Sequence, residues 1–140
     1  MRSILVLLVL AAASGFASAA ELRDPDAAVA LSEQIVSKAS SGDLRAGFEL
    51  ARPYVVIPQS EFDAMLGQLE LQLPVISARF GKSIGHELLR NDTVGGSLIQ
   101  TIYIHKFEKH AMVWRFVFYK NDKGWVLNSF KYADDLTSVL

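Results

Sequence analysis

The stretch from Met112 to Lys120 reads MVWRFVFYK, and after four turn-prone residues the chain continues as WVLNSFKYA from Trp125 to Ala133. Successive side chains of a strand point to opposite faces, so alternation along the first stretch predicts a strand with one wholly apolar face. The alternating apolar residues are Met112, Trp114, Phe116 and Phe118. The turn from Asn121 to Gly124 predicts a hairpin to the second stretch. An apolar sheet face of this kind requires a cover from other elements.

Two more strands are predicted before this hairpin. Ile84 to Asn91 is a candidate first strand, and Ser97 to Phe107 is rich in β-branched and aromatic residues. Gly95 and Gly96 lie between them and favour a hairpin turn. Four consecutive strands joined by short turns predict an antiparallel meander.

The amphipathic segments available to cover the sheet come earlier in the chain. Asp24 followed by Pro25 predicts a helix start, because the carboxylate accepts hydrogen bonds from free backbone donors and proline suits the first turn. The run from Ser40 to Gly42 predicts the end of this helix. Asp43 caps a second short helix in the same way, and Pro53 stops it.

A longer third helix is predicted from Ser60, which with Asp63 forms a cap of the S-x-x-D kind. Its apolar residues recur every three or four positions and so form one stripe. They are Phe62, Leu66, Leu69, Leu73, Ile76 and Phe80. Pro74 removes a backbone donor inside this stripe, but the stripe continues in phase, which favours one kinked helix over two helices. We expect the stripe from Phe62 to Leu73 to pack on the Trp114 face.

Residues 1–19 have the layout of a cleavable secretory signal. They carry an early Arg2, an unbroken apolar run from Ile4 to Ala13 and the small-residue triplet Ala17-Ser18-Ala19. The apolar run covers only half of the ~20 residues that a membrane-spanning helix needs. We therefore expect cleavage after Ala19, a periplasmic or secreted location, no membrane attachment after cleavage, and a single domain over residues 20–140.

The composition excludes several classes of function. The chain has 14 basic and 15 acidic residues and a net charge of −1, and removal of Arg2 makes that charge more negative. A chain without a basic excess is a poor partner for phosphate backbones, so no nucleic-acid binding is expected. The sequence contains no cysteine. Disulfides, a thiolate nucleophile, thiolate metal ligands and a lipoprotein anchor are therefore excluded.

Helices followed by a long antiparallel meander, which ends in WRFVFYK from Trp114 to Lys120 and GWVLNSF from Gly124 to Phe130, resemble the nuclear transport factor two-like, or cystatin-like, α+β roll. The resemblance covers the chain from about Pro25 to Asp135. More narrowly, the chain resembles small exported bacterial proteins of that superfamily that are grouped as domains of unknown function. It implies N-terminal helices packed on a curved antiparallel sheet of about four strands. It also implies a conical cavity, which different members use for catalysis, ligand binding or protein binding.

Four residues are the candidates for a ligand-binding or partner-binding site: Tyr103, His105, Arg115 and Tyr119. They offer a cation and aromatic hydroxyls, which suit recognition. Alternation places them away from the Trp114 face or leaves their face undecided. An ordinary structural role carries more weight for His105, as a hydrogen-bonded histidine, and for Arg115, as a surface partner for a carboxylate. The same holds for Tyr119, which with Tyr132 can close the rim of the sheet.

No group of residues forms a catalytic or metal-binding pattern. The three histidines, His86, His105 and His110, do not have the spacing of a metal site, so no metal and no cofactor is expected, and His110 is expected to be solvated in a hairpin loop. Enzymes of the ketosteroid-isomerase type in this superfamily use a carboxylate base in an apolar cavity. The middle two strands offer no Asp, and Glu108 lies outside the apolar face. There is also no G-x-S-x-G nucleophile elbow.

These observations favour an exported, non-catalytic domain that binds a small apolar or anionic molecule or a protein partner. A small metal-independent cavity enzyme, of the isomerase or dehydratase type, is the leading alternative. A partner-inhibiting module is the third, although the Q-x-V-x-G loop of cystatins is absent from the sequence. The sequence does not identify the ligand or partner, and it leaves a homodimer open.

Overall fold

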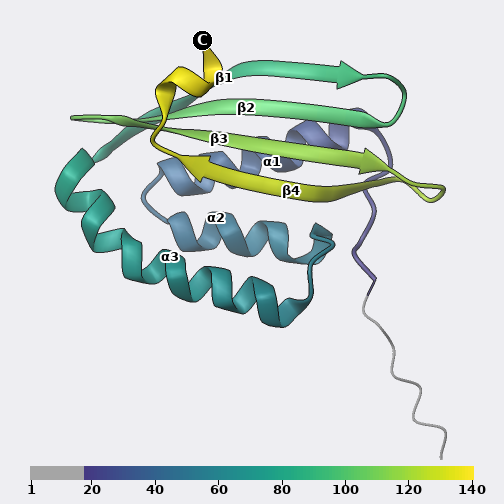
Figure 1. Cartoon of the computed structure of the whole chain (residues 1–140), viewed down its shortest axis with the longest axis horizontal. Coiled ribbons are helices and arrows are strands. Elements are labelled where there is room, and N and C mark those ends of the chain that lie inside the picture. The colour runs from purple at the N-terminus through teal and green to yellow at the C-terminus, as the bar shows by residue number, and fades with distance from the viewer. Residues whose placement is uncertain (1–17) are drawn as a thin grey trace, which may run out of the picture.

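The computed structural model of the chain describes residues 18–140, so most of the predicted signal segment, with Arg2 and the run from Ile4 to Ala13, lies outside the described residues. In chain order the elements are α1 (Pro25–Ser40), α2 (Leu44–Ala51), the 3₁₀ helix η1 (Arg52–Tyr54), α3 (Gln59–Phe80), β1 (Ser83–Val94), β2 (Leu98–Phe107), β3 (Ala111–Lys120), β4 (Trp125–Ala133) and the 3₁₀ helix η2 (Leu136–Val139). The strands form one antiparallel sheet in the order β1-β2-β3-β4 (Figure 1). The predicted α+β class, with N-terminal helices packed on a curved antiparallel sheet, is confirmed.

The starts of α1 and α2 agree with the predicted caps. Oδ1 of Asp24 accepts a hydrogen bond from the backbone N–H of Ala27 at 2.8 Å, and Oδ1 of Asp43 accepts one from Ala46 at 2.9 Å. Each carboxylate satisfies a backbone donor that the first turn of a helix leaves without an intrahelical partner. The two caps therefore fix where α1 and α2 begin, and the second also fixes the turn at residues 41–43 that separates these helices.

The cap predicted at Ser60 is wrong. α3 begins one residue earlier, at Gln59, and Pro58 occupies the N-cap position without a side-chain hydrogen bond. The carbonyl of Pro58 accepts from the N–H groups of Glu61 and Phe62 at 3.0 and 3.1 Å. Because Ser60 already lies within the first turn of α3, its hydroxyl is not at the N-cap position.

The continuity of α3 through Pro74 is confirmed. The helix runs without interruption to Phe80, and Figure 1 shows it bending along its length. Pro74 has no N–H to donate to the carbonyl of Glu70, and a bond missing on one side of a helix is an established cause of bending. The bend carries the last turns of α3 toward the start of β1.

The core lies between the inner face of the sheet and the helices. Trp114, Phe116 and Phe118 are fully buried there, which confirms the apolar face predicted for β3. The ring of Phe48 in α2 meets the ring of Trp114 edge-on, with centroids 5.5 Å apart. From the stripe of α3, Phe62, Leu66 and Leu69 join this core, whereas Leu73 is only partly buried against it. The first half of α3 therefore contributes to the cover as predicted, and α1, which contacts all four strands, contributes together with α2.

α1 and α2 approach each other closely at Gly47. A Cβ atom at this position would lie 2.7 Å from the backbone carbonyl oxygen of Ile35 in α1, closer than real Cβ contacts come. Only glycine therefore permits this crossing without a shift of backbone. The crossing holds the C-terminal end of α1 beside the beginning of α2, which is where the candidate site described below is formed.

The two edges of the sheet differ. At the β4 edge, Leu22 pairs with Trp125 through two backbone hydrogen bonds of 2.7 and 2.8 Å, and Val55 forms a parallel bridge with Leu127. At the opposite edge, β1 pairs only with β2 within the described part of the chain. The β4 edge is thus partly covered by the chain itself, whereas the β1 edge is open.

Candidate functional site

The four predicted site residues lie on two different faces of the sheet. Cross-strand register places Tyr103 opposite Trp114 and His105 opposite Met112, so Tyr103 and His105 lie on the inner, helix-covered face. Alternation alone left the face of these two residues undecided, and the register now assigns both of them to the Trp114 face. Arg115 and Tyr119 lie on the outer face, as predicted. The four side chains consequently do not form one surface.

Tyr103 is fully buried and ties β2 to α1. Its hydroxyl is 3.1 Å from Oγ of Ser32, which itself donates to the carbonyl of Val29 at 2.8 Å. Because the serine proton is used on that carbonyl, the tyrosine is the donor to Ser32. Burial raises the pKa of Tyr103 above its ordinary value. Tyr103 therefore acts as a neutral hydrogen-bond donor inside the core.

Arg115 and Tyr119 lie apart on the outer face. The guanidinium of Arg115 donates from Nη2 to the backbone carbonyl of Ser138 at 3.1 Å and so holds the segment that contains η2 against the sheet. Tyr119 is 45% exposed near the far end of β3. The cation predicted for ligand recognition thus already has a partner in the C-terminal segment.

His105 is buried and has a defined tautomer. Its Nε2 is 2.8 Å from Oγ of Ser83, and this Oγ is 2.6 Å from the carbonyl oxygen of Ser40. A carbonyl can only accept, so Ser83 donates to Ser40 and accepts from Nε2–H of His105. Nδ1 is left as a lone pair, and it has no partner within residues 18–140. Burial, with a smaller contribution from His86, lowers the pKa of His105 to about 4, so the ring is neutral at pH 7.

A second histidine forms a line of hydrogen bonds with the residue types of a hydrolase triad. Nε2 of His86 is 2.6 Å from Oε1 of Glu33, and its Nδ1 is 2.8 Å from Oγ of Ser40. Ser40 is the last residue of α1. The C-terminus of a helix presents carbonyl oxygens and partial negative charge, whereas an oxyanion intermediate needs N–H donors. We therefore interpret this line as a structural link between β1 and α1.

His110 is not the solvated loop residue that was predicted. It is half-buried, and its ring meets the ring of Phe80 edge-on with centroids 4.8 Å apart. The contact joins the β2–β3 hairpin to the end of α3. Two further hydrogen bonds support the junction, from the N–H of Lys109 to the carbonyl of Phe80 at 2.9 Å and from the N–H of Glu108 to Lys82 at 3.0 Å.

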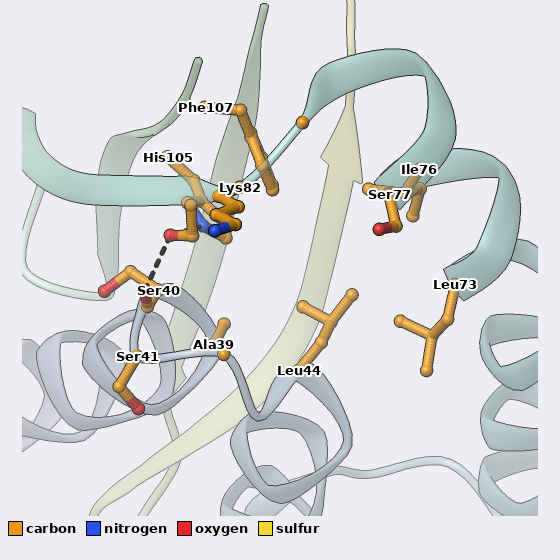
Figure 2. A pocket seen from close by; sticks show the side chains of 13 residues that line it. Ala39, Ser40, Ser41, Leu44, Leu73, Ile76, Ser77, Lys82, His105 and Phe107 are labelled. Carbon is orange, nitrogen blue, oxygen red and sulfur yellow. Dashed lines mark hydrogen bonds between the residues drawn. The ribbon is translucent and has the colours of Figure 1, made fainter.

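A hollow of about 460 Å³ opens where the α1–α2 turn, the second half of α3 and β2 meet, and we call it the α3–β2 pocket. Its apolar wall consists of Leu44, Leu73, Ile76 and Phe107, and its polar lining includes Ser77, Lys82 and His105. Figure 2 shows the side chains of Leu44, Leu73 and Phe107 directed into the hollow from three different elements. This volume lies within the range of small-molecule sites, which is roughly 300–1,000 Å³. Of the predicted site residues, only His105 lines it.

Most of this pocket was not predicted from the sequence. Ser40 and Ser83 belong to ordinary turn-like segments, and no motif indicates that they meet beside His105. Leu73 and Ile76 did carry a signal, because they continue the apolar stripe of α3 but remain only partly buried. A stripe residue that the core does not cover is a candidate for lining a hollow.

Comparisons with known proteins assign no relationship: no protein family, no curated protein and no solved structure matches the chain. Across residues 18–140, no group of three or more histidine or acidic side chains is arranged to hold a metal ion. The helices of the same region do not have the length and apolar character needed to cross a membrane. The function must therefore be inferred from the geometry of the site.

Proposed function

We propose that this chain is an exported, non-catalytic protein that binds a small, mainly apolar molecule in the α3–β2 pocket. The observation that carries the proposal is the pocket itself, a hollow of about 460 Å³ with an apolar wall that the helices leave open. The order of helices first and meander afterwards also supports membership of the nuclear transport factor two-like superfamily, whose cavities serve such roles in some members.

Binding is favoured over catalysis because the pocket lacks an accessible general base. Ser83 and His105 are bonded to each other, and Ser83 also donates to the carbonyl of Ser40. The residues that line the pocket include no Asp or Glu. A general base for proton abstraction needs a carboxylate or an accessible histidine within hydrogen-bond reach of the substrate. The free nitrogen of His105 is sealed from solvent, so it does not meet this requirement as the structure stands.

The lining also indicates which end of the ligand lies outward. Leu44, Leu73, Ile76 and Phe107 offer contacts to an apolar body, whereas Lys82 is an exposed cation among the lining residues. No ion pair of Lys82 occurs within the described region, so its charge is available. An amphipathic molecule with an anionic group near Lys82 and its apolar part against Leu73 and Ile76 suits this arrangement.

Filling the pocket should abolish binding of an amphipathic anion. The fluorescent probe anilinonaphthalene sulfonate is titrated into the wild-type protein and into the Ile76→Trp variant, whose larger side chain occupies the hollow. We expect the dissociation constant to rise at least about tenfold in the variant, the effect of losing roughly 1.4 kcal/mol of contacts. Gln68→Trp, at an exposed position of α3 outside the pocket, is the control and should bind as the wild type does. Equal affinity in all three proteins would disprove this site.

Export should leave a mature chain that begins at Ala20. The proposal rests on the signal layout of residues 1–19, and the fold accommodates cleavage after Ala19 because the nitrogen of Ala20 donates to the carbonyl of Pro53 at 2.8 Å. A new amino terminus at Ala20 retains this donor. Mass spectrometry of the extracytoplasmic fraction is the measurement. An intact Met1 terminus, found only in the cytoplasm, would contradict the proposal.

A further inference from the structure

The open edge of the sheet is a surface that neither the core nor the α3–β2 pocket explains. β1 is the longest strand, with 12 residues, and its outer side has no pairing partner within residues 18–140. Unpaired backbone N–H and C=O groups along an edge form a template for another strand. The β4 edge, in contrast, is partly occupied by Leu22 and Val55.

The side chains of β1 protect this edge only in part: three charged residues, Glu87, Arg90 and Asp92, stand among exposed apolar ones. Proteins commonly place lysine or proline on exposed edge strands to prevent pairing, and β1 contains neither residue. It carries exposed apolar side chains instead: Ile84, Leu88, Leu89 and Val94. Ile84 is 64% exposed and Val94 is 58% exposed, one near each end of the strand. The exposed apolar side chains are therefore spread along the whole strand, with Leu88 on the inner face and Val94 on the outer face.

A bulge in the middle of β1 sets which side chains share a face. Glu87 lies opposite Ile104 and Arg90 lies opposite Ile102, with a register shift between Leu88 and Arg90. Both partners in β2 are on the outer face, so Glu87 and Arg90 are on the outer face as well. In a regular strand, residues three positions apart point to opposite faces. The extra residue of the bulge brings this acidic and this basic side chain to the same face.

We propose that a second copy of this chain pairs antiparallel with β1, about a two-fold axis perpendicular to the sheet between Leu88 and Leu89. This centre is the midpoint of β1, and the paired residues share a face from Gly85 to Asp92; a second register shift, between Ser83 and Gly85, ends this match. The overlap buries the exposed apolar residues of the edge and makes the two sheets continuous. Such a two-fold contact uses the same surface on both copies.

Charge complementarity supports this occupant and this register. The axis places Glu87 of each copy opposite Arg90 of the other copy, so that two ion pairs form on the outer face. Directly opposed charges of opposite sign stabilise a strand pair, and like charges destabilise it. Asp92 comes opposite Gly85, so no like charges face each other. Within each chain Glu87 also pairs with Lys106 at 3.1 Å, and Nη2 of Arg90 donates to the carbonyl of Val139 at 3.4 Å, so the ion pairs between copies add to these contacts.

The test exploits the two ion pairs by charge reversal. Molar mass is measured by light scattering after size exclusion for the wild type, Glu87→Arg, Arg90→Glu and an equimolar mixture of the two variants. We expect a wild-type dimer, and dissociation constants at least about tenfold higher for each variant alone, because like charges then face each other twice. In the mixture, one chain has two basic residues and the other two acidic residues at these positions, so a heterodimer should form. Lys131→Glu, an exposed reversal on β4, is the control and should leave the dimer unchanged.

Recovery in the mixture also shows that both variants are folded, which separates loss of pairing from loss of fold. A monomeric wild type, variants that dimerise as the wild type does, or a mixture that stays monomeric would each overturn the proposal. Hydrogen exchange gives a second measurement: amides of β1 should become more protected as the protein concentration rises. Protection that appears only when an extended peptide is added would assign the edge to a different partner and overturn self-pairing. None of these outcomes depends on the α3–β2 pocket.

Discussion

Replacing Trp114 by Ala should lower the free energy of unfolding by about 3–5 kcal/mol, the usual loss when a buried large aromatic side chain is truncated. Trp114 is fully buried in the centre of β3. Its ring packs against Phe48 of α2 and Tyr132 of β4, both with centroids 5.5 Å away. Alanine at this position therefore removes a contact shared by a helix and two strands. Chemical denaturation of the wild type and the variant gives the difference directly.

Tyr119→Ala is the matched control for this prediction. Tyr119 lies on the same strand but on the outer face, where it is 45% exposed, so its loss should change the free energy of unfolding by no more than about 0.5 kcal/mol. Trp114→Phe should cost less than Trp114→Ala, because it retains most of the ring and removes an indole N–H that has no partner within residues 18–140. Equal losses for Trp114→Ala and Tyr119→Ala would mean that the two faces of β3 have been exchanged.

Acidification should destabilise the fold through His105 before most carboxylates titrate. Burial lowers the pKa of His105 in the folded protein to about 4, below the ordinary value of 6.5. Between these two values the unfolded chain binds a proton that the folded chain does not bind, so stability falls as pH falls. At pH values above this window the histidine is neutral in both states and makes no such contribution. The expected loss is about 2 kcal/mol between pH 7 and pH 5.

His105→Gln is the variant that isolates this effect. Glutamine does not titrate in this range, and its amide can still donate to Oγ of Ser83, the present partner of Nε2. The variant should therefore lose much less stability between pH 7 and pH 5 than the wild type does. Free energies of unfolding from denaturant titrations at both pH values provide the comparison. Identical pH dependence in the two proteins would show that His105 is accessible to protons in the folded state.

The fold was predictable from local patterns that have a single physical explanation. The alternation in β3 and the aspartate caps of α1 and α2 were interpreted correctly because each depends on neighbours only a few residues away. The start of α3 was predicted incorrectly, because the helix begins at Gln59 with Pro58 at the N-cap position, before the expected serine cap. β1 was predicted to end at Asn91, but it continues to Val94 because the tight turn at Gly95, with φ of 58°, keeps the two strands paired to their ends.

The site was less predictable, because it depends on which distant residues meet. β2 carries buried side chains on both faces, including Ile102 outside and Tyr103 inside, so a period of two does not reveal which face is inner. Only the register with β3 decides that His105 lies beneath the helices. The partner of His105, Ser83, is 22 residues away in sequence, and the carbonyl of Ser40 is 43 residues from Ser83. No spacing rule connects these three residues.

The chain order of the elements also determines when the fold can be completed. Synthesis proceeds from the N-terminus, so the three helices are made before any of the strands on which they pack. The bond between Ser32 and Tyr103 joins residues 71 positions apart, and Leu22 can pair with Trp125 only after the last hairpin has been made. Contacts of such long range form late and slow the folding of a domain. The core of this protein therefore cannot be completed until Trp125 and Leu127 of the last strand have been synthesised.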